Sequence, residues 1–504
     1  MESAIASDID HNRASSEDVG TKKTEPNRLK KVNWNLILVL LWASLIIVNF
    51  SRLFYNNFWV DECYTILTAQ KPLDEIMNLT KYADANPPLY YILVKLFCEI
   101  LGYNTFVYCF VSFIPYLILM ILSLTFIRKN FGIDSAAVVM LFASILEQSQ
   151  YYITEVRAYN WALFFLFIMF LVCYKILKES DIKYYVLITV VYICACYTHY
   201  YALMGGGLVL LGMIIRSAIV KDKRNFWLSS ASLLISFIAF TPWLQFFMKE
   251  SSDITNPDFW IQSTPLITEC IVYMFGYNPS VIIFLVLVGV TVIVLLGKIG
   301  VLKKTGKIEQ LFDMDNDKWS IVSIGLFAIF GVTIFTAAVS HLKSPILALR
   351  YVFPLAGIAW TIVAIFVSGC RFRKKFMVVV LLFTLVIGIP HCCIWMSGEY
   401  QENVVITETL DSTRPLMAGD VVILTNESRF IGYECTYYYP DAENYYLRSD
   451  EFPTLIPTKQ YWLFLASEID NGMIEKLSEQ GHSYELIKPN GRLGSDPMWV
   501  YLVN

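Results

Sequence analysis

The apolar residues of this chain gather in blocks of about 18 to 23 residues, and a block of that length crosses the hydrocarbon core of a bilayer as one helix. The composition agrees, because 56% of the 504 residues are hydrophobic and only 16% are charged, against roughly a quarter charged in ordinary soluble domains. Nothing in the chain resembles the basic patch of a nucleic-acid-binding protein. We therefore expect a polytopic α-helical membrane protein with no nucleic-acid partner.

About eleven of these blocks are expected to be transmembrane helices. They lie near residues 34–50, 106–127, 134–152, 158–174, 184–200, 202–220, 226–247, 279–297, 319–339, 350–369 and 376–396. Residues 1–33 are polar and end in a basic cluster. We therefore expect a disordered cytoplasmic head followed by a signal anchor.

A short apolar segment, Pro88–Leu101, decides the topology, and it carries Lys95 and Glu99 one helical turn apart. If this segment does not cross, 24 Lys and Arg residues of the membrane part lie on the side of the amino terminus and 8 on the other side. If it crosses, every later loop changes sides and the excess is reversed. Because cytoplasmic loops carry the excess of Lys and Arg, we expect an interfacial or re-entrant helix here, a cytoplasmic amino terminus and an external carboxyl terminus.

The carboxyl-terminal residues 398–504 differ in kind, because their apolar runs are short. The runs VVITE, DVVILT, QYWLFLA and WVYLV have the pattern of strands, and the stretch 473–480 has that of a helix. We expect a small extracytoplasmic α/β domain there. Before it we expect one transmembrane domain over residues 34–397, whose first outer loop, residues 51–104, holds interfacial helices.

With this topology, charged side chains collect at the outer ends of the spans, where they are expensive unless they are paired or functional. Asp61 and Glu62 follow an aromatic pair just beyond the first span. Adjacent side chains on a helix diverge by about 100°, so only one of the two acids can readily point into a given site. Such an acid can take a proton from a hydroxyl or bind a divalent cation, and an interfacial acid without function is the simpler alternative.

Two arginines, Arg157 and Arg350, lie at the outer ends of later spans. Their guanidinium groups match phosphate oxygens and stay charged at any relevant pH. Both are therefore candidates for phosphate binding, and Lys95 and Lys343 are weaker candidates. Arginines that only snorkel to the membrane surface are the alternative.

Five further side chains of the outer face are candidates for a substrate pocket, namely Asn86, Glu155, Tyr159, His199 and Tyr351. Metal chemistry has little support, because the 5 histidines form no HxxxH or HExxH pattern and the 11 cysteines form no CxxC. The sequence leaves open whether a divalent cation is bound.

Taken in order, these motifs resemble those of the membrane glycosyltransferases with the GT-C fold. The chain has an aromatic-Asp-Glu element after the first span, PPLYY at the start of the interfacial helix, E-x-R-x-Y before the fourth span and H-Y-Y after the fifth. The likeness is clearest over residues 57–210 and looser at LALRYVFP. The branch that the chain resembles contains the dolichyl-phosphate-mannose protein mannosyltransferases, the lipid A aminoarabinose transferases and the lipopolysaccharide-core galacturonosyltransferases.

The resemblance implies a catalytic membrane domain that passes a sugar, with inversion, from a polyprenyl-phosphate donor to a lipid, glycan or protein acceptor on the outer face. It implies Asp61 as the base that deprotonates the acceptor hydroxyl and Glu62 as a structural or metal-binding neighbour. Arg157 and Arg350 would hold the donor phosphate. Asn86 stands where relatives often have the histidine of a His-Pro-Pro element, so no role of that histidine carries over.

A transporter or flippase of lipid-linked saccharides is the main alternative, because it also needs many spans and a basic outer cavity. The chain shows no repeat-related pair of broken spans, which counts against it. A polysaccharide polymerase or ligase is a third interpretation, but it normally lacks the early Asp-Glu loop. The sequence leaves the sugar and the acceptor open, and the polar head without a retention signal favours a bacterial plasma membrane.

Overall fold

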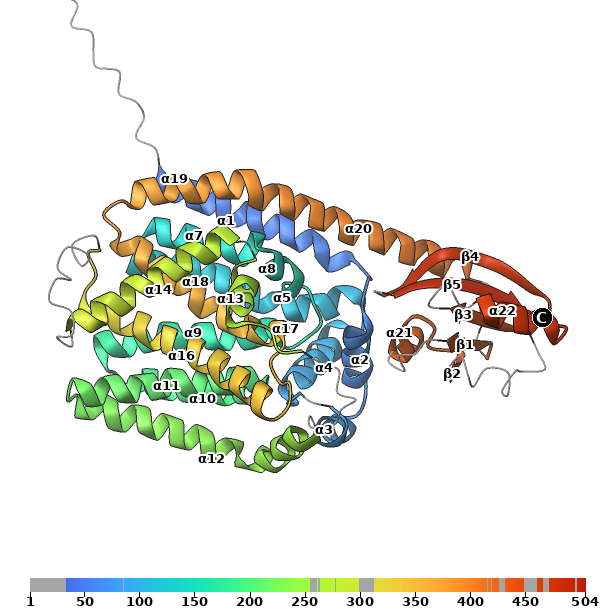
Figure 1. Ribbon diagram of the computed structural model, residues 1–504, viewed down its shortest axis with the longest axis horizontal. Coiled ribbons are helices and arrows are strands. Elements are labelled where there is room, and N and C mark those ends of the chain that lie inside the picture. The colour runs from blue at the N-terminus through green and yellow to red at the C-terminus, as the bar shows by residue number, and fades with distance from the viewer. Residues whose placement is uncertain are drawn as a thin grey trace, which may run out of the picture.

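The computed structural model of the chain describes residues 33–84, 86–253, 261, 263–276, 278–298, 312–414, 416–417, 419–425, 431–447, 460–465, 471–494 and 496–504. In these residues a bundle of long helices is followed, beyond one of its ends, by a five-stranded sheet (Figure 1). The expected class, a polytopic helical membrane protein with a small carboxyl-terminal α/β unit, is confirmed.

Seven helical segments of the described residues are long and apolar enough to cross a membrane. These segments are Trp34–Phe54, Thr105–Phe131, Tyr159–Glu179, Tyr200–Ile219, Lys223–Lys249, Asn316–Leu342 and Leu349–Gly369. Shorter apolar helices cover Ile133–Ile145, Ile182–Cys196 and Phe284–Gly297. The eleventh predicted span, residues 376–396, lies in the helical stretch from 373 to 412.

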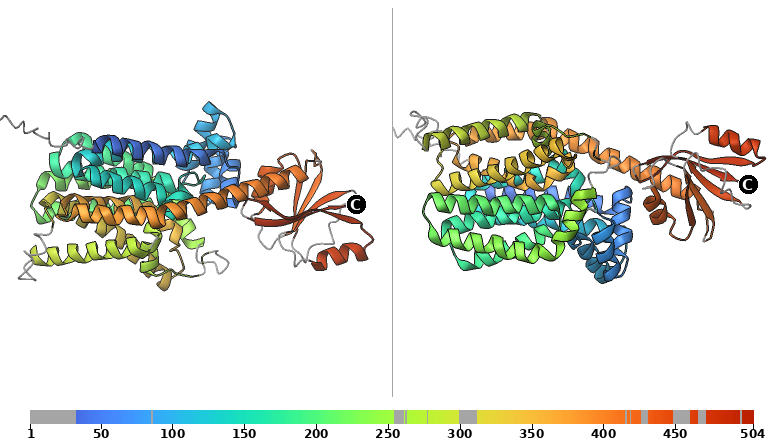
Figure 2. Two further views of the ribbon diagram at one scale, coloured as in Figure 1. Left: turned by 90° about the horizontal axis from the view of Figure 1, so that it is seen from above. Right: turned by 60° about the horizontal axis from the view of Figure 1, so that its bottom comes forward.

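The bundle is built from the following elements in chain order: α1 (Trp34–Phe50), α5 (Thr105–Leu122), α6 (Arg128–Phe131), α7 (Ile133–Ile145), α8 (Glu147–Tyr152), α9 (Tyr159–Glu179), α10 (Ile182–Cys196), α11 (Tyr200–Ile219), α12 (Lys223–Asp253), α13 (Ile267–Phe275), α14 (Asn278–Lys298), α16 (Asn316–Leu342), α17 (Leu349–Val352), α18 (Ala356–Gly369), α19 (Arg373–Phe383) and α20 (Ile389–Ser412). Helices α9 and α18 are buried nearly all round, because they are apolar on every face. Helices α1 and α12 leave large apolar side chains exposed on the rim of the bundle, where lipid would cover them (Figure 2).

The predicted span 134–152 is wrong as one helix, because the chain turns at Leu146 between α7 and α8. Polar side chains satisfy the backbone and one another there. The Ser149 hydroxyl donates to the carbonyl of Phe142 at 2.8 Å, and the Gln150 amide donates to Asn49 Oδ1 at 3.1 Å. A break in a transmembrane helix is tolerated where buried side chains replace the missing helical hydrogen bonds.

Three short helices lie at the end of the bundle nearest the sheet: α2 (Val60–Ala69), α3 (Leu73–Tyr82) and α4 (Leu89–Leu101) (Figure 1). Helix α4 is the segment whose crossing was in question, and its 13 residues are too few to span a bilayer. It buries Val94 and Cys98 against the bundle and exposes Leu96 and Ile100. An apolar outer edge of this kind suits a helix that lies along the membrane surface.

The carboxyl-terminal sheet has the strand order β2-β1-β3-β5-β4. Its elements are β1 (Val421–Thr425), α21 (Ile431–Tyr438), β2 (Glu443–Leu447), β3 (Tyr461–Leu465), α22 (Asn471–Glu479), β4 (Tyr484–Leu493) and β5 (Asp496–Val503). Strand β1 pairs in parallel with β2 and β3, whereas β5 pairs antiparallel with β3 and β4. Side chains on both faces of the sheet are buried, as expected for parallel strands between covered faces.

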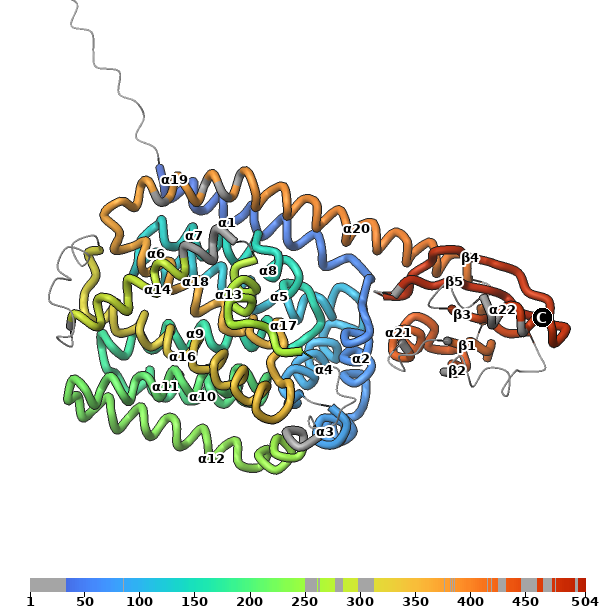
Figure 3. Tube along the Cα trace, viewed as in Figure 1, coloured from blue at the N-terminus to red at the C-terminus, as the bar shows by residue number. Residues whose placement is uncertain are grey.

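One strand predicted from the sequence, VVITE at residues 404–408, is wrong because this run is helical and lies within α20. The π-helical turn Thr384–Gly388 joins α19 to α20, and α20 then runs without a break to Ser412 (Figure 3). The buried side chain of Ile406 shows why packing overrides the strand preference of the β-branched residues here. The expected boundary between residues 397 and 398 falls inside this helix.

Candidate active site

The first turn of α2 carries both acids of the aromatic-Asp-Glu element. The helix begins at Val60, and the Glu62 carboxylate reaches back to accept the backbone N–H of Trp59 at 3.2 Å. This contact is half of a capping box, and acids in a first helical turn also interact favourably with the helix dipole. Asp61 and Glu62 then point in different directions and enter two different environments.

Asp61 meets both predicted arginines, which come from segments about 100 and 290 residues further along the chain. Its Oδ2 atom lies 3.4 Å from Arg350 Nη1 and 3.7 Å from Arg157 Nη2. Arg157 Nη1 also donates to the backbone carbonyl of Asp61 at 3.2 Å and to the Thr65 hydroxyl at 3.0 Å. Arg157 is thus held against α2 by several bonds, and Arg350 reaches the same carboxylate from α17.

These three side chains form a site that is partly open to solvent. The exposed fractions are 29% for the Asp61 side chain, 26% for Arg350 and 11% for Arg157. Arg350 also lines an open hollow of about 690 Å³ whose far wall includes Glu269 and Tyr273 of α13. Two guanidinium groups around one carboxylate leave a positive charge, so the site favours a further anion such as a phosphate.

Glu62 is buried on the other side of α2. Its Oε1 atom accepts the backbone N–H of Val156 at 2.7 Å. Burial raises the pKa of Glu62 to about 8, although the backbone donors of Val156 and Trp59 favour its charged form. Glu62 is therefore protonated at neutral pH and is not positioned to act as the base.

Glu155 lies next to Glu62 and is also buried. Its Oε1 atom accepts the indole N–H of Trp59 at 3.2 Å, and its Oε2 atom has no hydrogen-bond partner among the described residues. Burial, and then the neighbouring Glu62, raise the pKa of Glu155 well above its usual range. Two neighbouring buried carboxylates cannot readily ionise together, so the pair does not carry two negative charges.

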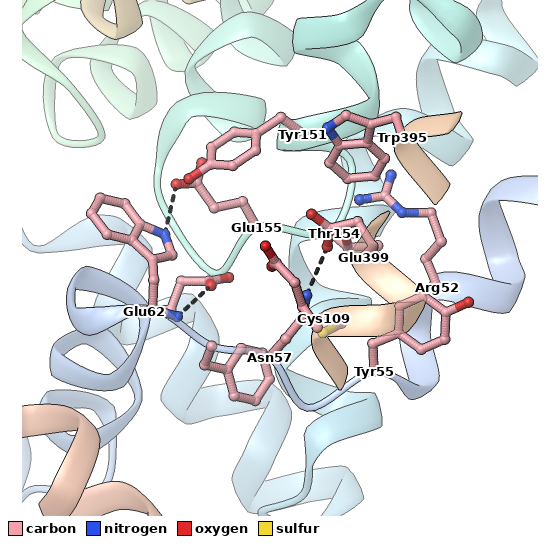
Figure 4. Close-up of a pocket in the computed structure, with 13 residues that line it drawn as sticks. Arg52, Tyr55, Asn57, Glu62, Cys109, Tyr151, Thr154, Glu155, Trp395 and Glu399 are labelled. Carbon is pink, nitrogen blue, oxygen red and sulfur yellow. Dashed lines mark hydrogen bonds between the residues drawn. The ribbon is translucent and has the colours of Figure 1, made fainter. Parts of the chain in front are cut away.

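Glu62 and Glu155 line a cavity of about 160 Å³ (Figure 4). Two further acids, Glu399 and Glu402 of α20, also line it, as does one arginine, Arg52. Asp61 is not among the lining residues. The first turn of α2 therefore separates the site that holds Arg157 and Arg350 from a smaller cavity that four acids and one arginine line.

His199, Tyr159 and Tyr351 pack together behind the arginines. The His199 ring centroid lies 5.3 Å from that of Tyr159 and 5.5 Å from that of Tyr351, and His199 Nδ1 accepts the backbone N–H of Tyr201 at the start of α11. Burial and the two arginines lower the pKa of His199 to about 3. His199 is thus a neutral support for the ring cluster, and it contributes no positive charge.

Asn86 lies next to an acid that the sequence analysis did not select. The Asn86 amide donates to Asp84 Oδ1 at 3.0 Å, and the hydroxyl of Tyr91 donates to the other oxygen of Asp84. Tyr91 in turn packs edge to face against Tyr64 of α2, with ring centroids 6.3 Å apart. Asp84 was not predicted as a site residue because it belongs to no motif of the sequence, whereas Asn86 belongs to the Asn-Pro-Pro motif.

Neither predicted lysine joins this cluster. Lys95 pairs with Glu99 within α4, with Nζ 2.9 Å from Oε1. Lys343 is exposed at the end of α16 and lines neither of the two hollows. In the described part of the chain, no three His, Cys, Asp or Glu side chains gather as metal ligands.

No family model and no curated protein sequence matches the chain. Among solved structures, the chain is similar to ArnT from Cupriavidus metallidurans in the apo state, with 10% identity and a TM-score of 0.56 over 93% of this chain and 97% of ArnT. The same protein bound to undecaprenyl phosphate gives 12% identity and a TM-score of 0.53 over 92% and 98%. At such low identity the likeness shows the fold alone. The chain therefore has the fold of ArnT, a lipid A aminoarabinose transferase, and of the GT-C membrane glycosyltransferases that its motifs resemble.

Proposed function

We propose that the chain is a glycosyltransferase that moves a sugar from a polyprenyl-phosphate donor to a hydroxyl of an acceptor on the outer face of the membrane. The observation that carries this proposal is the contact of Asp61 with both Arg157 and Arg350 at one end of a bundle with the GT-C fold. The undecaprenyl phosphate bound to ArnT supports a donor of this kind. A site outside the cell needs a donor that can be moved across the bilayer, which a lipid-linked sugar provides.

The chemistry assigns one task to each side chain. The donor phosphate binds to the two guanidinium groups, and Asp61 takes the proton of the acceptor hydroxyl. The hydroxyl oxygen forms a bond to the anomeric carbon as the bond from that carbon to the phosphate oxygen breaks. The leaving polyprenyl phosphate gains one negative charge, which Arg157 and Arg350 stabilise. A single displacement of this kind inverts the anomeric centre.

Glu62 serves the site as a structural residue in this proposal. Its carboxyl group accepts the backbone N–H groups of Trp59 and Val156. Trp59 lies two residues before Asp61, and Val156 lies directly before Arg157. The protonated state of Glu62 keeps a second negative charge away from the donor phosphate. In this proposal Asp61 acts as the charged base, whereas its sequence neighbour Glu62 stays protonated.

The proposed orientation places the amino terminus in the cytoplasm and the sheet outside, as the distribution of Lys and Arg favours. The short helices α2, α3 and α4 lie at the same end of the bundle as the sheet, and α1 begins at the opposite end (Figure 2). The active site then faces the outer side, in a plasma membrane that we propose to be bacterial.

The test is transfer from a panel of radiolabelled polyprenyl-phosphate sugars in membranes that contain the native chain, Asp61→Asn or Asp74→Asn. Asp74 is an exposed acid in the first turn of α3, so Asp74→Asn is the matched control. We expect release of free polyprenyl phosphate with the native chain and the control only, and the productive donor names the sugar. Movement of intact labelled lipid between the leaflets, equal in all three membranes, would establish the transporter alternative instead.

A further inference from the structure

The extended segment that leads into α2 is held by the carboxyl-terminal part of the chain. The Tyr438 hydroxyl of α21 donates to the carbonyl of Asn56 at 2.8 Å and lies 3.3 Å from the carbonyl of Phe58. The adjacent Tyr437 hydroxyl donates to Asn56 Oδ1 at 2.9 Å. Two neighbouring tyrosines therefore bind the backbone and one side chain of a segment more than 370 residues earlier in the sequence.

Helix α20 binds the same segment from another side. The Asn403 side chain accepts the backbone N–H of Asn56 at 2.8 Å, and Glu399 accepts the amide of Asn57, also at 2.8 Å. Between them, α20 and α21 satisfy both the donor and the acceptor of the Asn56 backbone. A backbone with both groups bonded to fixed partners cannot shift without breaking those hydrogen bonds.

The turn between β4 and β5 closes this contact. Gly494 has φ of +55°, and a Cβ atom built on it would collide with the carbonyl oxygen of Phe58 and with the Glu434 carboxylate of α21. Gly494 is therefore packed closely against Phe58, the residue that precedes Trp59, the N-cap of α2. Only glycine fits this position without displacing one of the two neighbours.

We propose that α21 and the β4–β5 turn position the Asp61 carboxylate, so that the carboxyl-terminal unit is part of the active site's support. The proposal rests on the proposed transferase function of Asp61. Phe58 is three residues before Asp61, and Trp59 fixes the first turn of α2 by accepting the N–H groups of Glu62 and Cys63 at 2.9 and 3.0 Å. A shift of the Asn56–Phe58 segment therefore turns α2 and moves Asp61 away from the acceptor hydroxyl. Tyr437 and Tyr438 are positioning residues in this proposal.

The first experiment compares the double variant Tyr437→Phe/Tyr438→Phe with the control Tyr439→Phe. Tyr439 is the next residue along the chain, and its hydroxyl bonds to Thr413 inside the carboxyl-terminal unit, away from Asn56. We expect the double variant to lower kcat by roughly 10-fold to 100-fold while KM for the donor changes by less than about twofold. Hydrogen–deuterium exchange of residues 55–63 should also become faster in the double variant alone. The control should match the native chain in both readouts.

The second experiment uses glycines and tests the hairpin contact. Gly494→Ala and Gly481→Ala both place a Cβ at positive φ, but a Cβ at Gly481 would meet no atom within 4 Å. Both variants place a Cβ at positive φ, so a difference between them reports the collision with Phe58 and Glu434. We expect Gly494→Ala to reproduce the loss of kcat and the faster exchange, and Gly481→Ala to leave both unchanged.

The outcomes separate this inference from the proposed function. If the native chain transfers sugar and the tyrosine double variant does so at the rate of Tyr439→Phe, the positioning role is overturned and the transferase function stands. If the native chain transfers no sugar, the proposed function is overturned. Unchanged exchange of residues 55–63 in both the double variant and Gly494→Ala overturns the structural link regardless of activity.

Discussion

Asp61 and Glu62 are neighbours in the sequence, yet the two faces of α2 on which they lie have opposite properties. The Asp61 face is partly open and holds two guanidinium groups. The Glu62 face borders a smaller cavity lined by four acids and one arginine. One helical turn can thus divide a motif into a side chain that meets two guanidinium groups and a side chain that holds the backbone.

The largest effect should come from removing the charge on the open face. Asp61→Asn keeps the size of the side chain but cannot accept a proton from the acceptor hydroxyl. We expect kcat to fall by about 10³-fold or more, with the apparent melting temperature in detergent close to that of the native chain. Steady-state transfer assays and thermal unfolding check this, and full activity in the purified variant would remove Asp61 from the mechanism.

The two arginines should differ in their contribution. Arg157 is the more buried and makes two further hydrogen bonds to α2, whereas the Arg350 guanidinium lies 5.7 Å from the ring centroids of Trp59 and Tyr351. We expect Arg157→Lys to lower kcat/KM for the donor by about 10²-fold and Arg350→Lys by about tenfold, because lysine lacks the forked donors. Titration of the donor at fixed acceptor concentration measures both values. Equal losses would show that the contacts of Arg157 with α2 do not matter for donor binding.

The stability of the folded chain should depend on pH through the buried Glu62. The Glu62 carboxyl is ionised in the unfolded chain above pH 4.5 and stays protonated in the folded chain up to about pH 8. Between these values the unfolded state binds fewer protons, so the free energy of unfolding falls as pH rises. Glu62→Gln should remove the contribution of Glu62 to this pH dependence of stability. The contribution of Glu155 should remain, because its pKa is raised as well.

Apparent melting temperatures at about pH 6 and about pH 9 test this. The native chain and the exposed-acid control Asp74→Asn should lose stability between the two values, and Glu62→Gln should lose less. The NH2 group of the new glutamine side chain cannot accept a hydrogen bond, so one of the two backbone N–H groups that Glu62 holds is left without its partner. The variant should therefore be destabilised by about 1–3 kcal/mol at the lower pH. An identical pH dependence of all three chains would contradict the neutral state of Glu62.

The smallest effects should come from the two lysines. Lys95 is paired with Glu99 in α4 and Lys343 is exposed at the end of α16. We expect Lys95→Ala and Lys343→Ala to change kcat/KM for the donor by less than about twofold, as exposed ion pairs and free surface charges contribute little. A tenfold loss in either variant would bring that lysine back into the phosphate site.

The helical bundle could be predicted from the sequence because a bilayer imposes one simple rule on composition and length. The turn at Leu146 could not, because it depends on hydrogen bonds of Gln150 with residues on other helices. Strands β1, β3 and β5 were predicted from their apolar runs. Strand β2 was missed because its apolar run is only three residues long, and β4 because it is largely polar. The run at 404–408 was assigned to a strand because its β-branched residues favour a strand locally. Its helical structure follows from its place within the long helix α20.

The open side of the candidate site was predictable in its members, since Asp61, Arg157 and Arg350 each stand out as charges at the ends of apolar spans. Their contact was not, because distances across a bundle do not follow from spacing in the sequence. The tyrosines of α21 could not be found at all in this way. They lie in a tyrosine-rich stretch of the carboxyl-terminal unit, and nothing in that stretch indicates contact with the first outer loop.

The unbroken course of α20 has a mechanical consequence. A straight helix acts as a rod, so its outer half must tilt whenever the membrane forces its inner half to tilt. Asn403 and Glu399 lie on this rod and hold Asn56 and Asn57. A change in the thickness of the surrounding bilayer should therefore shift the residues before α2, so the rate of the proposed sugar transfer should depend on the lipids around the chain.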